Sequence, residues 1–281
     1  MSTHDPVAVP LTVAGEGDSV VRLTGAGLSF GARSLWSDLD LDVRPGEFLT
    51  VLGSNGSGKS SLLKTVLGLQ PLTSGRIELL GRPVTRGDRR VGYVPQQRLI
   101  PAGTPLRGRD LVALGVDGHR PGLRLTGRAD VRRRVDEALA AVGAQGYADR
   151  AIGRLSGGEQ QRLRVAQALV SDPALLLCDE PLISLDLSQQ RAVSELIDRR
   201  RRTHATPVLF VTHDINPVLE MTDRVLYFAA GSHRLGTPDE VLRSDVLSEL
   251  YGTRVDVAEV GGRIVVLGAT EQSEHCHVQA G

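Results

Sequence analysis

Several features that mark particular classes of protein are scarce in this 281-residue chain. Its two cysteines, Cys178 and Cys276, are too few for a disulfide scaffold and fit a reducing compartment. Aromatic residues make up only 3%, so the 41% hydrophobic content indicates a mainly aliphatic globular core. The beginning of the chain lacks the basic-then-apolar pattern of a signal peptide, and no apolar run approaches about eighteen residues. We therefore expect a soluble chain that spans no membrane.

A net charge of either sign is also missing, because 33 basic residues balance 33 acidic ones. This balance argues against a dedicated nucleic-acid binder and against an acidic disordered chain, so we expect no nucleic-acid partner. Lysine occurs only at Lys59 and Lys64, and every other basic residue is arginine. The arginine runs Arg132–Arg134 and Arg199–Arg202 are expected to be solvated helix faces, with phospholipid contact as the alternative.

The order of apolar runs and turns predicts an α/β domain with a largely parallel sheet. Strands are predicted at Val20–Leu23, Leu39–Val43, Phe48–Leu52, Ile77–Leu80, Ala174–Cys178, Pro207–Val211 and Arg224–Phe228. Helices are predicted at Lys59–Leu69, around Val131–Val142 and Leu163–Val170, and at Leu187–Arg202 and Pro238–Tyr251, followed by a hairpin around Gly261-Gly262. We expect one domain over residues 19–268, a helical subdomain inserted at about residues 97–168, and flexible tails at 1–18 and 269–281.

A glycine-rich segment follows the predicted strand Phe48–Leu52 and opens the next helix. Its residues Gly53, Ser54, Asn55, Gly56, Ser57, Gly58, Lys59 and Ser60 match the phosphate-binding pattern G-x-x-x-x-G-K-[ST]. Glycines allow backbone N–H groups to surround a phosphate, and the helix N-terminus adds positive potential. We expect Lys59 to reach the β- and γ-phosphates of a nucleotide and the Ser60 hydroxyl to hold Mg²⁺.

Two adjacent carboxylates end the apolar run Leu175-Leu176-Leu177-Cys178. Ligands in open α/β sheets bind beyond the carboxyl ends of the strands, which is where Asp179 and Glu180 emerge. We assign Asp179 to Mg²⁺ through water and Glu180 to polarising the attacking water. Without the phosphate loop, this Asp-Glu-Pro sequence would indicate a helix-capping turn.

A second candidate anion site opens a later helix at Leu155-Ser156-Gly157-Gly158-Glu159-Gln160-Gln161-Arg162. Ser156 and Glu159 form a capping-box pattern, which is the simpler structural interpretation. The two glycines exceed what a cap needs and expose backbone N–H groups at the helix N-terminus. Two such sites far apart in sequence suggest a nucleotide held between two bodies.

In combination, these segments resemble the ATP-binding subunits of ABC transporters over roughly residues 20–250. The resemblance also rests on Ser184-Leu185-Asp186 and on Val211-Thr212-His213-Asp214. It implies a P-loop NTPase (RecA-like) core with a mixed sheet, an antiparallel β subdomain and an inserted helical subdomain. It also implies that two copies pack head to tail, so that each ATP lies between the phosphate loop of one chain and the Ser156–Gly158 segment of the other.

The resemblance extends to individual residues. It implies that Phe30 stacks on adenine, that Gln96 senses Mg²⁺ and couples to the permease, and that His213 is a switch histidine. It also places Asp186 and Glu159 at the partner's ATP and extends the ATP contacts of the phosphate loop to Ser61. The cofactors implied are ATP and Mg²⁺, with Ser60, Gln96 and Asp179 around the metal. The partners implied are a second copy, an integral membrane permease and, indirectly, an extracytoplasmic solute-binding protein, on the cytoplasmic face of the cell membrane.

The remaining segments narrow the subtype. Four segments are similar to those of the ATPases of manganese, zinc or iron importers, namely Val211–Leu219, Asp223–Leu226, Gly236–Pro238 and Leu250–Gly252. Ala113-Leu114-Gly115 also resembles the iron–siderophore and cobalamin group. A soluble ABC ATPase without a transport role and a nucleotide-binding regulator without turnover are further alternatives. In the tail, His275-Cys276-His277 are metal-ligand types, although a structural zinc would need a fourth ligand.

Overall fold

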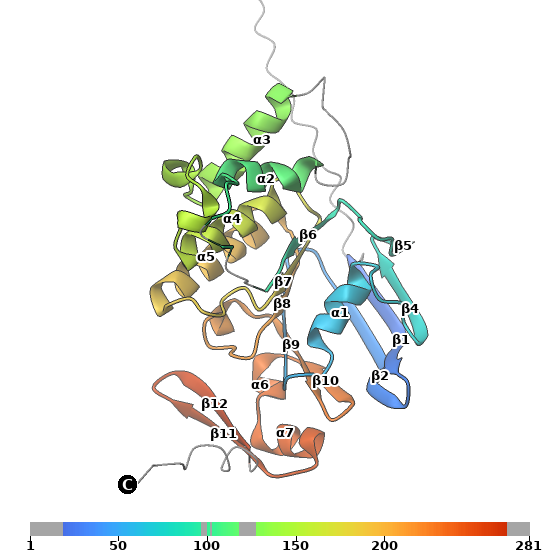
Figure 1. The fold of residues 1–281 in the computed structure, drawn as a ribbon. Coiled ribbons are helices and arrows are strands. Elements are labelled where there is room, and N and C mark those ends of the chain that lie inside the picture. The colour runs from blue at the N-terminus through green and yellow to red at the C-terminus, as the bar shows by residue number, and fades with distance from the viewer. Residues whose placement is uncertain (1–18, 97–99, 102, 118–127, 269–281) are drawn as a thin grey trace, which may run out of the picture.

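The computed structural model describes residues 19–96, 100–101, 103–117 and 128–268 of the chain. The predicted tails, including His275-Cys276-His277, lie outside the described residues. Two main sheets, a separate hairpin and the helices that cover them make up the fold (Figure 1). No helix in the described ranges is both long and apolar enough to cross a membrane.

A six-stranded sheet has the strand order β10-β9-β3-β8-β7-β6. Every neighbouring pair is parallel except β10–β9, which is antiparallel. The strands are β3 (Phe48–Gly53), β6 (Val91–Val94), β7 (Leu175–Asp179), β8 (Val208–Val211), β9 (Arg224–Ala229) and β10 (Ser232–Gly236). This sheet confirms the predicted mixed α/β fold class.

A second sheet is fully antiparallel and has the order β2-β1-β4-β5. It consists of β1 (Val21–Phe30), β2 (Arg33–Val43), β4 (Ser74–Leu79) and β5 (Arg82–Pro83). Helix α1 (Lys59–Val66) lies between the two sheets (Figure 1). Its buried residues Leu62, Leu63 and Val66 belong to the apolar core that joins them.

The central strands are buried on both faces, and their alternation divides the core in two. On β7, Leu175 and Leu177 face the core that contains α1, whereas Leu176 and Cys178 face the opposite core. Burial raises the pKa of the Cys178 thiol, which is free and inert in this position. The same alternation directs the next residue, Asp179, toward the α1 side of the sheet.

The opposite core is covered by the helical part of the chain (Figure 1). Its helices are α2 (Gly108–Asp117), α3 (Arg128–Ala141), α4 (Gly157–Leu169) and α5 (Leu187–His204), with short 3₁₀ turns η1 (Gln145–Tyr147) and η2 (Ile152–Arg154). Helix α2 and strands β6 and β10 are absent from the sequence prediction. They are short, and each takes its stability from a neighbouring element, which single-sequence periodicity does not reveal.

The C-terminal part contains η3 (Leu219–Met221), α6 (Pro238–Val241), α7 (Ser244–Tyr251) and the hairpin β11 (Val255–Val260) and β12 (Arg263–Gly268). The hairpin turns at Gly261-Gly262 as predicted, with φ of 59° and 75°. The helical stretch predicted over Pro238–Tyr251 consists of two helices, α6 and α7. Leu242 and Arg243 leave the helical region, with ψ of 61° and 146°, and thus separate α6 from α7.

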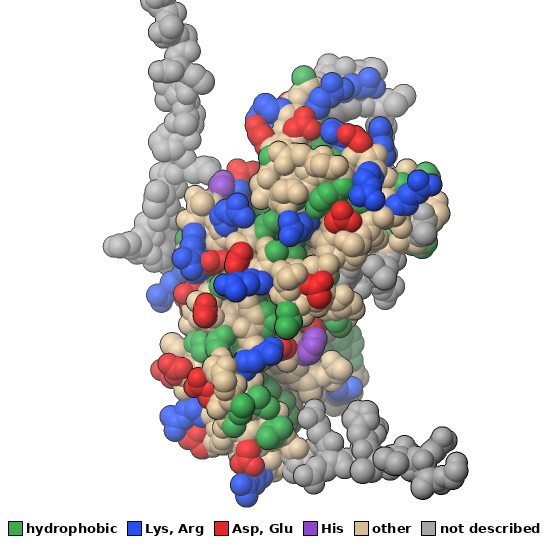
Figure 2. Space-filling model, turned by 90° about the vertical axis from the view of Figure 1, so that its left-hand side faces the viewer, with side chains coloured by type: hydrophobic (Ala, Val, Ile, Leu, Met, Phe, Trp, Pro, Cys, Tyr) green, Lys and Arg blue, Asp and Glu red, His purple; other side chains and the backbone are tan. Residues whose placement is uncertain are grey.

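Arg132–Arg134 is exposed at each position, as expected of a solvated helix face, whereas the run Arg199–Arg202 differs from that expectation. Arg201 is largely buried, bonds Asp198 and Asp223, and lies over the ring of Phe48. Arg200 is also largely buried and pairs with Asp172 at 2.5 Å. Only Arg199 and Arg202 of this run are exposed, because helix α5 packs its C-terminal turns against the sheet and the loop before β7. Over the face drawn in Figure 2, basic and acidic side chains are interspersed.

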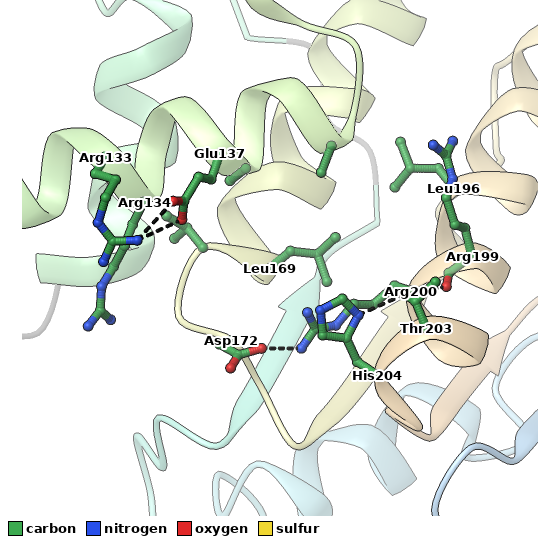
Figure 3. A pocket seen from close by; sticks show the side chains of 13 residues that line it. Arg133, Arg134, Glu137, Leu169, Asp172, Leu196, Arg199, Arg200, Thr203 and His204 are labelled. Carbon is green, nitrogen blue, oxygen red and sulfur yellow. Dashed lines mark hydrogen bonds and ion pairs between the residues drawn. The ribbon is translucent and has the colours of Figure 1, made fainter. Parts of the chain in front are cut away.

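A cavity of about 640 Å³ lies between α3, the end of α4 and α5 (Figure 3). Its basic rim is largely neutralised, since Arg133 bonds Glu137 and Asp130 while Arg200 bonds Asp172. It is separate from the phosphate loop and from the carboxylates at the end of β7.

Candidate functional site

The phosphate loop connects the end of β3 to the start of α1. Gly53 has a φ of 139°, and a Cβ there would lie 2.3 Å from the carbonyl oxygen of Phe228. Gly58 has a φ of 106°, and a Cβ would lie 2.8 Å from the indole of Trp36. Both positions therefore require glycine for conformation and for space. The loop can curl only because these two residues have no side chain.

Lys59 is buried at the first position of α1. Its Nζ donates to the carbonyl oxygens of Gly53 at 2.6 Å and Ser54 at 3.0 Å, so the ammonium lies beneath the loop. Burial lowers the pKa of Lys59, and the nearby carboxylates of Glu180 and Asp179 oppose that shift. The loop, the lysine and the acidic pair are thus one electrostatic unit.

The Ser60 hydroxyl donates to Oδ1 of Asp179 at 3.0 Å, which joins α1 to the end of β7. The other oxygen of Asp179 accepts from the Tyr93 hydroxyl at 3.3 Å. Burial and the Asp179 charge raise the pKa of Tyr93 to about 12, so the phenol remains a donor at neutral pH. Tyr93 is not among the residues predicted from the sequence. Its contact with Asp179 depends on the pairing of β6 with β7, for which the sequence carries no local signal.

Glu180 and His213 meet beyond the carboxyl ends of β7 and β8. Nδ1 of His213 lies 2.6 Å from Oε2 of Glu180. The Glu180 side chain is 12% exposed and that of His213 is 59% exposed. Glu180 has a φ of 49°, and its backbone N–H donates to the carbonyl of Val211 at 3.0 Å. Because of this left-handed backbone conformation, the Glu180 side chain points toward His213 while the Asp179 side chain points toward Ser60.

Residues of the site fit a nucleotide and a hard cation. The Ser57 hydroxyl is buried in the loop and has no hydrogen-bond partner among the described residues, so a phosphate oxygen would satisfy it. A cavity of about 270 Å³ adjoins the loop at Asn55 and Gly56. The paired oxygens of Ser60 and Asp179 are the ligand type that Mg²⁺ prefers.

The β1–β2 turn lies beside this cavity. Arg33 donates to the carbonyl of Gly56 at 3.1 Å, and its strand partner is Phe30. Phe30 is 52% exposed, an unusual state for a large aromatic ring. Phe30 is among the residues predicted from the sequence, whereas Arg33, which connects the turn to the phosphate loop, is not.

Other predicted site residues lie elsewhere. Ser156 caps α4 in a complete capping box with Glu159, and Asp186 caps α5 by accepting from the Gln189 N–H. That bond and the Ser188 hydroxyl lower the pKa of Asp186. Gly158 is buried, and a Cβ there would lie 2.7 Å from the Gln189 side chain, so the two helix starts approach closely.

The hydrogen bonds of the Ser156 and Asp186 caps stay within their own helix starts and do not reach the phosphate loop. Gln96 is exposed in the loop after β6, and Ser61 lies one residue beyond Ser60 on α1. Within the described residues, no group of three or more His, Cys, Asp or Glu side chains could hold a metal ion.

The phosphate loop, the two carboxylates and the parallel sheet define a P-loop nucleotide hydrolase. More specifically, the chain belongs to the ABC transporter family, whose model matches residues 36–183. It is an ATP-binding, ATP-hydrolysing subunit of this family.

Its relatives include the zinc import ATP-binding protein ZnuC of Yersinia pestis bv. Antiqua (strain Antiqua). The identity is 36% over 235 residues, which cover 84% of this chain and 86% of the relative. The zinc transport system ATP-binding protein TroB of Treponema pallidum (strain Nichols) is also 36% identical, over 226 residues that cover 79% and 82% of the two chains. A solved ABC transporter chain, inward-facing and assigned to the metal-chelate type, has a TM-score of 0.75 and 27% identity. That match covers 90% of this chain and 99% of the other.

Proposed function

We propose that this chain hydrolyses ATP to energise uptake of a divalent metal cation, with zinc favoured over manganese and iron, through a membrane permease. The observation that carries the cargo class is the 36% identity to a zinc import ATP-binding protein across 84% of the chain. The chain itself provides the ATPase activity, whereas the permease and an extracytoplasmic binding protein select the cargo. It acts as a peripheral protein on the cytoplasmic face of the membrane.

In the proposed reaction, the phosphate loop and Lys59 bind and orient the β- and γ-phosphates of ATP. Ser60 and Asp179 would hold Mg²⁺ together with Gln96, and the cation would neutralise charge on the phosphates. Glu180 orients the attacking water and accepts its proton, while His213, 2.6 Å from Glu180, holds that carboxylate in place beside the γ-phosphate. Phe30 offers its exposed ring to adenine.

Two copies of the chain would complete each ATP site. Ser156, Gly157, Gly158, Glu159 and Asp186 of one copy would contact the nucleotide held by the other. The support for this proposal is that Ser156 and Asp186 cap their own helices, whose N-termini attract anions, rather than bonding the phosphate loop of the same chain. ATP would therefore draw the two copies together.

Tyr93 provides a test of the proposed Mg²⁺ site. In Tyr93→Phe, Asp179 loses the donor that fixes one of its oxygens, while the ring remains. We expect the half-saturating Mg²⁺ concentration for ATP hydrolysis to rise roughly ten-fold, since partners of metal ligands tune affinity by about this factor. A magnesium titration at saturating ATP measures the shift. The half-buried Tyr251, whose hydroxyl bonds Tyr227 and not Asp179, offers the matched Tyr251→Phe control with no shift. An unchanged magnesium titration for Tyr93→Phe would contradict the proposed role of Tyr93 in positioning Asp179 at the Mg²⁺ site.

The cargo is tested by metal accumulation in cells that lack this chain. Complementation with the intact chain is expected to restore uptake of radiolabelled zinc at least several-fold, and to restore manganese and ferric siderophore less. Preferential rescue of siderophore or cobalamin uptake would replace the metal-cation proposal. A chain found only in the soluble fraction, with no effect on any cargo, would support the alternative of an ABC ATPase without a transport role.

A further inference from the structure

The histidine loop, residues 212–216, is held at both of its ends. Before His213, the backbone N–H of Thr212 donates to the carbonyl of Val51 on β3 at 3.1 Å. The Thr212 hydroxyl also donates to the carbonyl of Asp214 at 2.9 Å and accepts from its N–H at 3.2 Å. The N-terminal side of the histidine is thus attached to the strand that leads into the phosphate loop.

After His213, the loop is attached to the C-terminal hairpin by one side chain. Oδ1 of Asn216 accepts from the backbone N–H of Ile264 at 2.8 Å, and Nδ2 donates to the Ile264 carbonyl at 2.9 Å. The amide therefore pairs with the free edge of β12 as a neighbouring strand would. Nδ2 and the backbone N–H of Asn216 also donate to Oδ1 of Asp214, at 2.7 and 3.0 Å.

A cavity of about 530 Å³ lies between the hairpin and the phosphate loop, lined by Ser54, Asn55 and His213 and by Ile264 and Val266 of the hairpin. Among the described residues, both hydrogen bonds between β12 and the histidine loop are made by Asn216. In Figure 2, hydrophobic side chains gather in the lower part of the molecule, where Figure 1 places this hairpin.

We propose that Asn216 is a positioning residue for His213, and that it makes the C-terminal hairpin a support of the catalytic unit. The inference rests on the proposed role of His213. Because the histidine side chain is 59% exposed, little packing fixes it. Its direction depends on the loop, which bonds Val51 at one end and Ile264 at the other and buries Ile215 in the core. Removal of the amide breaks the attachment to Ile264 and leaves the Glu180–His213 contact without that restraint.

The test is ATP hydrolysis by the full-length chain carrying Asn216→Ala. We expect kcat to fall about ten-fold, since small displacements of a catalytic group are costly, while the KM for ATP stays within about two-fold. In a His213→Ala background, Asn216→Ala should cause no further loss, because residues that act through one another are not additive.

Ser244→Ala is the matched control. The Ser244 hydroxyl accepts from the Val257 N–H on the other strand of the hairpin at 2.8 Å, but it comes from α7 and does not touch the histidine loop. Because the Ser248 hydroxyl still accepts from the Val255 N–H at 2.9 Å, this variant should keep the hairpin in place and leave kcat unchanged. An equal loss in Ser244→Ala, normal turnover in Asn216→Ala, or an additive loss in the double variant would each overturn the proposal. A His213→Ala variant with full activity would instead contradict the proposed role of the histidine.

Discussion

Glu180→Gln is expected to lower ATP turnover by about 10²- to 10⁴-fold while ATP binding persists, because the change removes a proton acceptor but keeps the shape. The carboxylate is 12% exposed, and its Oε2 lies 2.6 Å from Nδ1 of His213. Among the described residues, Asp179 is the other acidic group at the end of β7. Steady-state phosphate release measures turnover, and fluorescent ATP binding measures affinity. With turnover blocked, ATP and Mg²⁺ should hold two copies together, which light scattering detects as a doubled mass.

The exposed Glu220 on η3 supplies the control for this experiment. Glu220→Gln makes the same chemical change and should leave turnover and mass unaltered. If Glu180→Gln hydrolysed ATP at the normal rate, the assignment of the proton acceptor would be wrong.

Lys59→Met is expected to raise the half-saturating ATP concentration by about ten- to a hundredfold, because hydrogen bonds from a charged donor contribute roughly 1.5–3 kcal/mol. Methionine has a similar length but no ammonium. The phosphates therefore lose the Lys59 donor, and so do the carbonyls of Gly53 and Ser54. Isothermal calorimetry with a non-hydrolysable ATP analogue measures the loss.

The other lysine of the chain, Lys64, provides the matched control for Lys59→Met. Lys64 lies exposed on the same helix, and Lys64→Met should bind the analogue as the unaltered chain does. Equal affinity for Lys59→Met and Lys64→Met would contradict the proposed phosphate site.

Local patterns were sufficient to predict much of the fold and the central part of the site. The strand Phe48–Leu52, the glycine-rich loop and the helix at Lys59 are contiguous in sequence, so their order alone fixes the geometry of a phosphate loop. The run Leu175–Cys178 is apolar at every position, as a strand buried on both faces must be, and it places Asp179 at the sheet edge.

Residues that depend on long-range pairing could not be predicted. Tyr93 meets Asp179 because β6 and β7 are neighbours, and Arg33 reaches Gly56 because the β1–β2 turn lies beside the loop. Asn216 bonds Ile264 across 48 positions. Arg200 and Arg201 are buried by partners that follow or precede them by at least twenty residues, Asp172 and Asp223. Composition and periodicity carry no information on such contacts.

Zinc accumulation in cells that carry Glu180→Gln in place of the intact chain tests the central claim most directly, namely that ATP hydrolysis at this site drives metal uptake. The intact chain is expected to restore accumulation. At the same level in the membrane fraction, Glu180→Gln is expected to leave it at the level of cells without the chain. Full accumulation with Glu180→Gln would contradict the claim.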